Sequence, residues 1–124
     1  RFYLAFLKGD YEKAYEMALI AYEQDSKKWF FTESPAICLI HMGKKKEAEA
    51  WKEKLIKTGN DYPGILEYAI GNIEGNMGNI ETAISHYKKS NHEGLYYNWF
   101  LFRNDPFTKP FMEDKRFLEA TKPR

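Results

Sequence analysis

Three short stretches of the chain share one pattern, a glycine followed five residues later by an alanine: Gly9-Asp-Tyr-Glu-Lys-Ala14, Gly43-Lys-Lys-Lys-Glu-Ala48 and Gly78-Asn-Ile-Glu-Thr-Ala83. The glycine recurs after 34 residues (9 to 43) and again after 35 residues (43 to 78). Glycine favours the left-handed backbone that ends a helix, and a small alanine lets two helices approach closely. The pattern therefore predicts three helical hairpins, each with its turn at one of these glycines.

Apolar residues on both sides of each glycine recur at intervals of three and four residues, which is typical of amphipathic helices. Residues Ala36–Ile40 are apolar nearly all round, so a buried strand is the alternative there. The repeat register favours a buried helix that begins near Ser34 or is kinked at Pro35. Asp10 and Asn79, each directly after a glycine, are expected to cap the helices that follow.

Composition and charge argue against several classes of protein. Hydrophobic residues make up 44% of the chain and aromatic residues 17%, which predicts a packed core and not a disordered chain. Because 19 lysines and arginines nearly balance 18 acidic residues, we expect binding to neither nucleic acid nor a membrane surface. No apolar run approaches the ~20 residues of a membrane helix. The chain begins with Arg1 and is apolar from Phe2 to Leu7, so we expect it to be part of a longer protein. We also expect a cytoplasmic location.

The glycine and alanine pattern in paired helices resembles the tetratricopeptide (TPR) repeat. The small first-helix position of that repeat is matched by Ala36 and Gly71, whereas Ser26 and Asn60 stand where its closing proline is customary. The resemblance implies an all-α, right-handed α-solenoid of about three helix pairs with a C-terminal capping helical segment, in one domain over residues 1–124. The implied parts are a partial first repeat (1–26), a second repeat (29–60), a third repeat (63–92) and a capping segment (93–124).

The tail departs from the repeat. An aromatic-rich helix is expected over residues 95–103, and Pro106 is expected to stop it. Asp114 is expected to cap a short last helix that carries Phe117. Aromatic side chains can cover the exposed face of the last helix pair. These side chains are Trp99, Phe100, Phe107, Phe111 and Phe117.

The same tail resembles the ending of many bacterial TPR proteins, in which an aspartate–proline pair and an arginine–phenylalanine pair close the array. The matching residues are Trp99, Asp105, Pro106, Pro110, Asp114, Arg116 and Phe117. The resemblance implies the C-terminal array of a larger bacterial protein, such as a regulator, a cyclase-like protein or a kinase.

Residue types that serve catalysis are present, but their spacing forms no site. His41, His86 and His92 include no pair four residues apart and no complete metal set. Cys38, the single cysteine, lies among apolar neighbours and is expected to be buried. We therefore expect no enzyme activity, no metal and no cofactor. Gly75 lies within an expected helix, where glycine costs up to about 1 kcal/mol relative to alanine, so we expect it to permit close packing, with ligand approach as the alternative.

In a solenoid of helical hairpins the first helix of each pair lines the concave face. The repeat register places Phe30, Glu33, Ile37, His41, Tyr68, Asn72 and Asn76 on that face. Asn72 and Asn76 are one turn apart and could bind a peptide backbone, although the lysine and arginine of the carboxylate clamp of some TPR domains are absent. We therefore predict a scaffold that binds a protein or peptide segment in this groove. The alternative is that these positions pack on residues 95–103.

The N-terminal end is a second candidate surface. Residues 2–7 are largely apolar, and a second copy of the chain or a missing repeat would have to cover them. The apolar members are Phe2, Tyr3, Leu4, Phe6 and Leu7. One alternative to a scaffold is therefore self-association into a homo-oligomer. Another alternative is a regulatory segment of a larger enzyme or transcription regulator.

Overall fold

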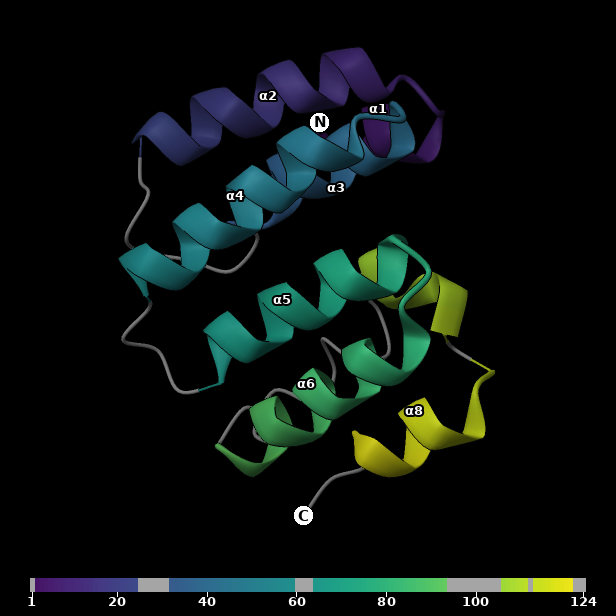
Figure 1. The fold of residues 1–124 in the computed structure, drawn as a ribbon. Coiled ribbons are helices and arrows are strands. Elements are labelled where there is room, and N and C mark those ends of the chain that lie inside the picture. The colour runs from purple at the N-terminus through teal and green to yellow at the C-terminus, as the bar shows by residue number, and fades with distance from the viewer. Residues whose placement is uncertain (1, 25–31, 60–63, 94–105, 112, 122–124) are drawn as a thin grey trace. The chain divides into compact units, whose positions relative to one another are not determined.

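All the secondary structure is helical in the residues that the computed structural model describes, namely 2–24, 32–59, 64–93, 106–111 and 113–121. No strand occurs in these ranges. The expectation of an all-α protein is therefore confirmed at this level. The helices fall into two compact units, Arg1–Thr58 and Gly59–Arg124 (Figure 1).

The described part of the first unit consists of two hairpins. They are formed by α1 (Phe2–Leu7) with α2 (Tyr11–Gln24), and by α3 (Ser34–His41) with α4 (Lys45–Thr58). Helix α2 packs on both α1 and α3, and α3 also packs on α4, so α3 is the central helix of the unit. All its residues from Ser34 to Ile40 are buried. The apolar run is thus a helix and not a strand.

Helix α3 begins at Ser34, as expected, and it carries Pro35 in its first turn. The first backbone N–H groups of a helix have no partner within the helix. The missing N–H of proline therefore removes no helical hydrogen bond there.

The second unit consists, in its described part, of one hairpin and two short helices. They are α5 (Ile65–Asn76), α6 (Ile80–His92), the 3-10 helix η2 (Pro106–Phe111) and α8 (Lys115–Ala120). The two hairpin helices pack along each other, η2 packs on α5, and α8 packs on α6 (Figure 1). Residues 106–121 therefore cover the hairpin. The helix predicted over residues 95–103, with Trp99 and Phe100, lies outside the described residues.

All three predicted turns are present, and they share one geometry. Gly9, Gly43 and Gly78 have φ angles of 82°, 78° and 94°, in the left-handed region that glycine favours. In each turn the glycine N–H donates to the carbonyl three residues earlier at 3.0 Å, and the next N–H donates to the carbonyl five residues earlier at 2.8–3.0 Å. These two bonds define the Schellman motif that ends a helix. The turn forms equally well at Gly43, although Lys44 is a poor capping residue.

The alanine of the repeated pattern has the same position in every hairpin. Ala14, Ala48 and Ala83 each lie in the first turns of the second helix, and each is fully buried. A small side chain at this point allows the second helix to approach its neighbour closely. The repeating element is thus a helical hairpin with one turn geometry and one buried small residue.

Two of the predicted capping residues make a capping hydrogen bond, and the third occupies the N-cap position without one. The Asp114 carboxylate accepts a hydrogen bond from the Arg116 N–H at 2.8 Å, and Asp10 accepts one from the Lys13 N–H at 3.4 Å. Asn79 makes no such bond. Its Nδ2 instead donates to Oε2 of Glu74 at 2.9 Å, because the buried carboxylate of Glu74 needs donors.

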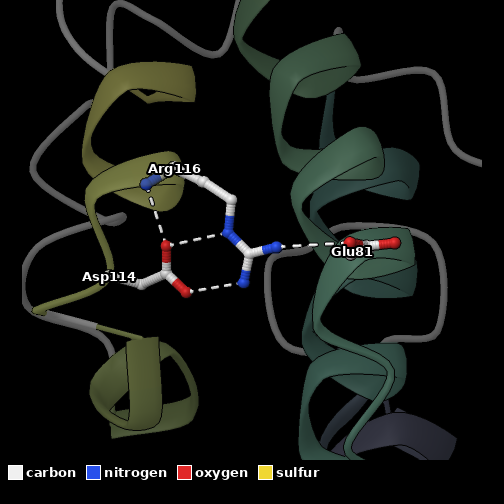
Figure 2. A network of polar contacts seen from close by, with 3 residues as sticks. All are labelled: Glu81, Asp114 and Arg116. Atoms are coloured by element: carbon white, nitrogen blue, oxygen red, sulfur yellow. Dashed lines mark hydrogen bonds and ion pairs between the residues drawn. The ribbon is translucent and has the colours of Figure 1, made fainter.

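Arg116 links the last helix to α6, as Figure 2 shows. Its Nε and Nη2 donate to the two carboxylate oxygens of Asp114 at 3.3 and 3.1 Å, and its Nη1 reaches Oε1 of Glu81 at 3.5 Å. The side-chain hydrogen bond from Arg116 lowers the pKa of Asp114. Because these groups lie at the surface, water screens their attraction, and the network orients α8 more than it stabilises the fold.

Candidate functional site

Two glycines allow aromatic rings to lie directly against the backbone of α5. A Cβ atom at Gly75 would lie only 2.0 Å from Cζ of Phe111, and a Cβ atom at Gly71 would lie 2.8 Å from Cε1 of Tyr87. Any side chain at either position would displace a ring. The predicted packing role of Gly75 is therefore confirmed, because Phe111 fills the space beside it.

The rings on α5, α6 and the tail form one aromatic cluster. Tyr87 lies 6.0 Å from Tyr68, 6.0 Å from Phe111 and 5.1 Å from Phe117, measured between ring centroids. Phe107 is also fully buried. The expectation that Phe107, Phe111 and Phe117 cover the last hairpin is confirmed. The space beside α5 is thus occupied by the protein's own tail.

Three of the predicted groove residues lie in this interior. Tyr68 and Asn72 are 1% and 0% exposed, and Asn76 is half-buried. The Tyr87 hydroxyl donates to Oδ1 of Asn72 at 2.6 Å, and Nδ2 of Asn76 donates to the carbonyls of Asn72 and Phe107 at 2.8 and 3.1 Å. Of the two asparagines predicted to bind a peptide backbone, Asn76 therefore binds backbone carbonyls of this chain itself, and Asn72 accepts from the side chain of Tyr87. A role of these residues in partner binding stays a prediction.

The other predicted groove residues belong to the first unit. Glu33 and Ile37 are fully buried at the start and middle of α3. His41, at the end of that helix, is exposed, and its ring stacks on Tyr11 at 4.9 Å and meets the edge of Phe6 at 5.3 Å. Phe30 lies outside the described residues. Among the groove residues that the structure describes, His41 and Asn76 are those that keep accessible surface.

The N-terminal edge of the first unit exposes apolar side chains, as the sequence predicted for Leu4 and Leu7. These two residues on α1 are 58% and 60% exposed, and Ile20 on α2 is 57% exposed. The expectation that Phe6 is exposed at this edge is wrong, because its ring is buried and contacts Tyr11 and His41. The side chains of Phe2 and Tyr3 lie outside the described part of the chain.

An open cavity of about 480 Å³ lies at the same edge, between α1 and α2. Its lining residues are Leu4, Ala5, Lys8, Asp10, Lys13 and Met17. Sequence analysis identified the apolar edge but not this cavity, because the cavity arises from the crossing of two helices.

A polar cluster between α5 and α6 has no counterpart among the sequence-based predictions. Oε2 of Glu67 contacts Nδ1 of His86 at 2.5 Å, and Oε1 of Glu67 contacts Nζ of Lys89 at 3.0 Å. Burial by itself raises the pKa of Glu67, but hydrogen bonds and positive charge from His86 and Lys89 outweigh it, so that pKa lies below its usual value. The antiparallel pairing of the two helices about Gly78 was the one signal that could have revealed the cluster.

The polar contacts of this cluster hold two helices together and do not form a catalytic site within the described residues. A carboxylate that holds one imidazole nitrogen can orient a general base, but catalysis also needs a reacting group beside that base. Within the described residues, no hydroxyl or thiol is hydrogen-bonded to His86, and the nearby Ser90 hydroxyl donates to the carbonyl of Gly64 at 2.6 Å. The contacts of Glu67 therefore join α5 to α6.

The rings of Trp51 and Tyr22 form an arrangement that could bind a cation, but a lysine of the same chain already lies over them. The ammonium group of Lys54 lies 4.7 Å from the ring centroid of Trp51 and 5.0 Å from that of Tyr22. The indole N–H of Trp51 donates to the carbonyl of Thr32 at 3.0 Å. These cation–π contacts link α2 to α4.

The single thiol is not placed for nucleophilic chemistry. Cys38 is fully buried, and burial raises its pKa to about 12, so the reactive thiolate does not form at neutral pH. Among the residues with described positions, no three histidine, cysteine or acidic side chains come together in a way that could hold a metal ion. The described helices include none with the length and apolar character needed to cross a membrane.

A scan against protein-family models gave no match, and neither did a search of curated proteins or a search of solved structures. The TPR resemblance therefore stays a prediction from the spacing of glycines and alanines.

Proposed function

We propose that this protein is a non-catalytic interaction module, a scaffold that binds a peptide or protein segment of a partner. The observation that supports this proposal is the recurrence of one hairpin, with the same Schellman turn at Gly9, Gly43 and Gly78 and a fully buried alanine five residues later. Helical hairpins that repeat in this way bury apolar surface against their neighbours and leave extended faces that bind other chains. The architecture that we propose for the repeats is a TPR-like right-handed α-solenoid.

The distribution of polar and apolar groups favours binding over catalysis. Asn72, Asn76 and Tyr87 use hydrogen-bonding groups within the chain, and Cys38 is held as a buried thiol. By contrast, Leu4 and Leu7 expose most of their apolar surface to water. Apolar surface that stays exposed on a folded protein commonly marks an interface with another molecule.

Selection from a displayed library of random peptides, with the folded 124-residue chain as bait, tests this proposal. We expect enrichment of a family of related peptides that bind with one-to-one stoichiometry in isothermal titration calorimetry. The matched control is Ala48→Glu, which forces a charge into a fully buried helix contact and should unfold its hairpin. Equal enrichment on the native chain and on the Ala48→Glu variant would contradict a folded binding surface.

Self-association is the second candidate function, and the exposure of Leu4 and Leu7 at the N-terminal edge favours it. Sedimentation velocity over a wide range of protein concentration tests it. A dimer that dissociates on dilution, and that the Leu7→Glu substitution abolishes, would support self-association. A chain that stays monomeric at the highest concentration would exclude it.

A further inference from the structure

The apolar part of the N-terminal edge extends along two helices. On α2, the edge residues Lys13, Met17 and Ile20 are separated by four and three residues, so they lie on one face of the helix. This stripe is about 10 Å long at the rise of an α-helix. On α1, Leu4 and Leu7 are separated by three residues and are both largely exposed. The cavity between the helices is thus the deeper part of a longer surface on which apolar side chains lie beside lysines.

A surface of this shape fits a helix better than an extended peptide. A bound amphipathic helix presents apolar anchors at intervals of three, four and seven residues, which correspond to one and two helical turns. The stripe from Lys13 to Ile20 also spans two turns. An extended peptide that binds as an added strand needs a row of unpaired backbone groups for its hydrogen bonds, whereas the backbone of α2 is already bonded within the helix.

The charges around the cavity specify the kind of helix. Lys8 lines the cavity from the turn after α1 and Lys13 from α2, and Asp10 is the one carboxylate among its six lining residues. Asp10 already accepts the backbone N–H of Lys13. Among the described residues, no carboxylate forms an ion pair with the ammonium group of either lysine. The cavity is therefore lined by both apolar and charged side chains, and its two lysines outnumber its one carboxylate.

Two other occupants fit these charges less well. In a two-fold symmetric dimer the same patch faces itself, so four lysines and only two aspartates would meet at one interface, and like-charge contacts there are costly. A nucleic-acid backbone would pair with the lysines but offers no apolar group to cover Leu4, Leu7 and Ile20. A helix with both apolar and acidic residues satisfies both requirements.

We propose that the N-terminal edge, formed by Leu4, Leu7, Lys8, Lys13, Met17 and Ile20, binds an amphipathic helix of a partner protein, with the partner's apolar anchors in the cavity and its acidic residues paired with Lys8 and Lys13. This inference rests on the proposed interaction function and names the chemistry of the partner. It places the binding surface on the edge of the first hairpin and not in the predicted groove.

Two synthetic helical peptides test the inference on the full 124-residue chain. Both carry leucines at intervals of three and four residues, and they differ only in the flanking residues, which are glutamates in one and lysines in the other. We expect the acidic peptide to shift the amide NMR signals of Leu4, Lys8 and Met17, and to bind about tenfold more tightly than the basic peptide at low salt. Stronger binding of the basic peptide, or no shift at the edge with either peptide, would overturn the inference.

Charge reversal supplies the matched comparison. The double substitution Lys8→Glu with Lys13→Glu should weaken the acidic peptide about tenfold and strengthen the basic one. The control, Lys44→Glu with Lys46→Glu, changes the net charge equally at exposed lysines of the second hairpin and should leave both affinities nearly unchanged. Equal effects of the two double variants would show that net charge, and not the edge, governs binding, and would overturn the inference. Circular dichroism verifies that each variant is folded.

Failure of this inference can be distinguished from failure of the proposed function. If peptides selected from the library bind with one-to-one stoichiometry but shift signals only outside α1 and α2, the edge inference is wrong and the interaction function stands. If selection yields no binder and neither synthetic peptide binds, both are wrong. A dimer that Leu4→Glu abolishes would assign the edge to a second copy of the chain, and would also overturn the inference.

Discussion

Replacement of Gly75 by alanine gives a sharp test of how the tail packs on α5. In an ordinary helix this change stabilises the protein, because glycine costs up to about 1 kcal/mol relative to alanine. Here the new Cβ would lie 2.0 Å from Cζ of Phe111, and also 2.7 and 2.9 Å from two further ring atoms. Since carbon atoms in contact are about 3.5–4.0 Å apart, the ring must retreat by about 1.5 Å.

The size of the effect follows from these two opposing terms. Overpacking of a buried site costs about 1–3 kcal/mol, and a displacement of this size at the fully buried ring of Phe111 places the cost in the upper part of that range. Subtraction of the gain in helix propensity leaves an expected loss of about 1–2 kcal/mol in the free energy of unfolding. Urea denaturation followed by far-UV circular dichroism measures this difference.

Two further variants separate the clash from other effects. In a Phe111→Leu background the atom nearest the new Cβ is absent, so Gly75→Ala should be neutral or stabilising there, with a coupling energy of about 1 kcal/mol or more between the two sites. Gly71→Ala, with a closest approach of 2.8 Å to the Tyr87 ring, should cost less than Gly75→Ala. If Gly75→Ala stabilises the otherwise unchanged protein, the packing of Phe111 against α5 is wrong.

Substitutions at three other sites test the turns, the interior hydrogen bonds and the polar cluster, each by urea denaturation. Gly43→Ala should lower the free energy of unfolding by about 1 kcal/mol through backbone strain alone, because no neighbouring atom meets its Cβ. Gly43→Asn should lower it by less. Equal stability of the native protein and both variants would argue against the left-handed turn. Tyr87→Phe removes the donor to Asn72 and should lower the free energy of unfolding by about 1–2 kcal/mol. An unchanged midpoint of urea denaturation would mean that the hydrogen bond is not formed. Because the pKa of Glu67 is lowered in the folded state, its stabilising effect is present above the unfolded pKa of about 4.3 and is lost as the pH falls through the lower folded value. The stability difference between the native protein and Glu67→Gln should therefore shrink below about pH 4, and a difference independent of pH would contradict the contact with His86.

The sequence was most informative where the structure depends on neighbouring residues. Each hairpin turn is closed by hydrogen bonds between residues three and five positions apart, so the glycine at its centre identifies it. The same holds for the start of α3 at Ser34 and for the cap at Asp114, since both depend on a few adjacent residues. These features were predicted correctly without knowledge of the tertiary structure.

Predictions were weaker where distant parts of the chain meet. The bond from Asn76 to the Phe107 carbonyl joins residues 31 positions apart, and Glu67 and His86 are 19 positions apart. The repeat register places Asn76 on the first helix of its pair but does not show that the tail accepts its hydrogen bond. The hydrogen bond from Asn79 to Glu74 was not predicted for the same reason, since the carboxylate that binds this side chain becomes apparent only in the folded hairpin.

The range over which these bonds act also sets an order of events in folding. Contacts between near neighbours form quickly, whereas contacts across long stretches wait for a large loop to close. Each glycine turn can therefore close as soon as its own two helices leave the ribosome. The ring that lies against Gly75 is that of Phe111, which belongs to η2 and is synthesised after both helices of the hairpin. We expect the last hairpin to keep a water-exposed apolar face until then, which makes it the segment in greatest need of a chaperone during synthesis.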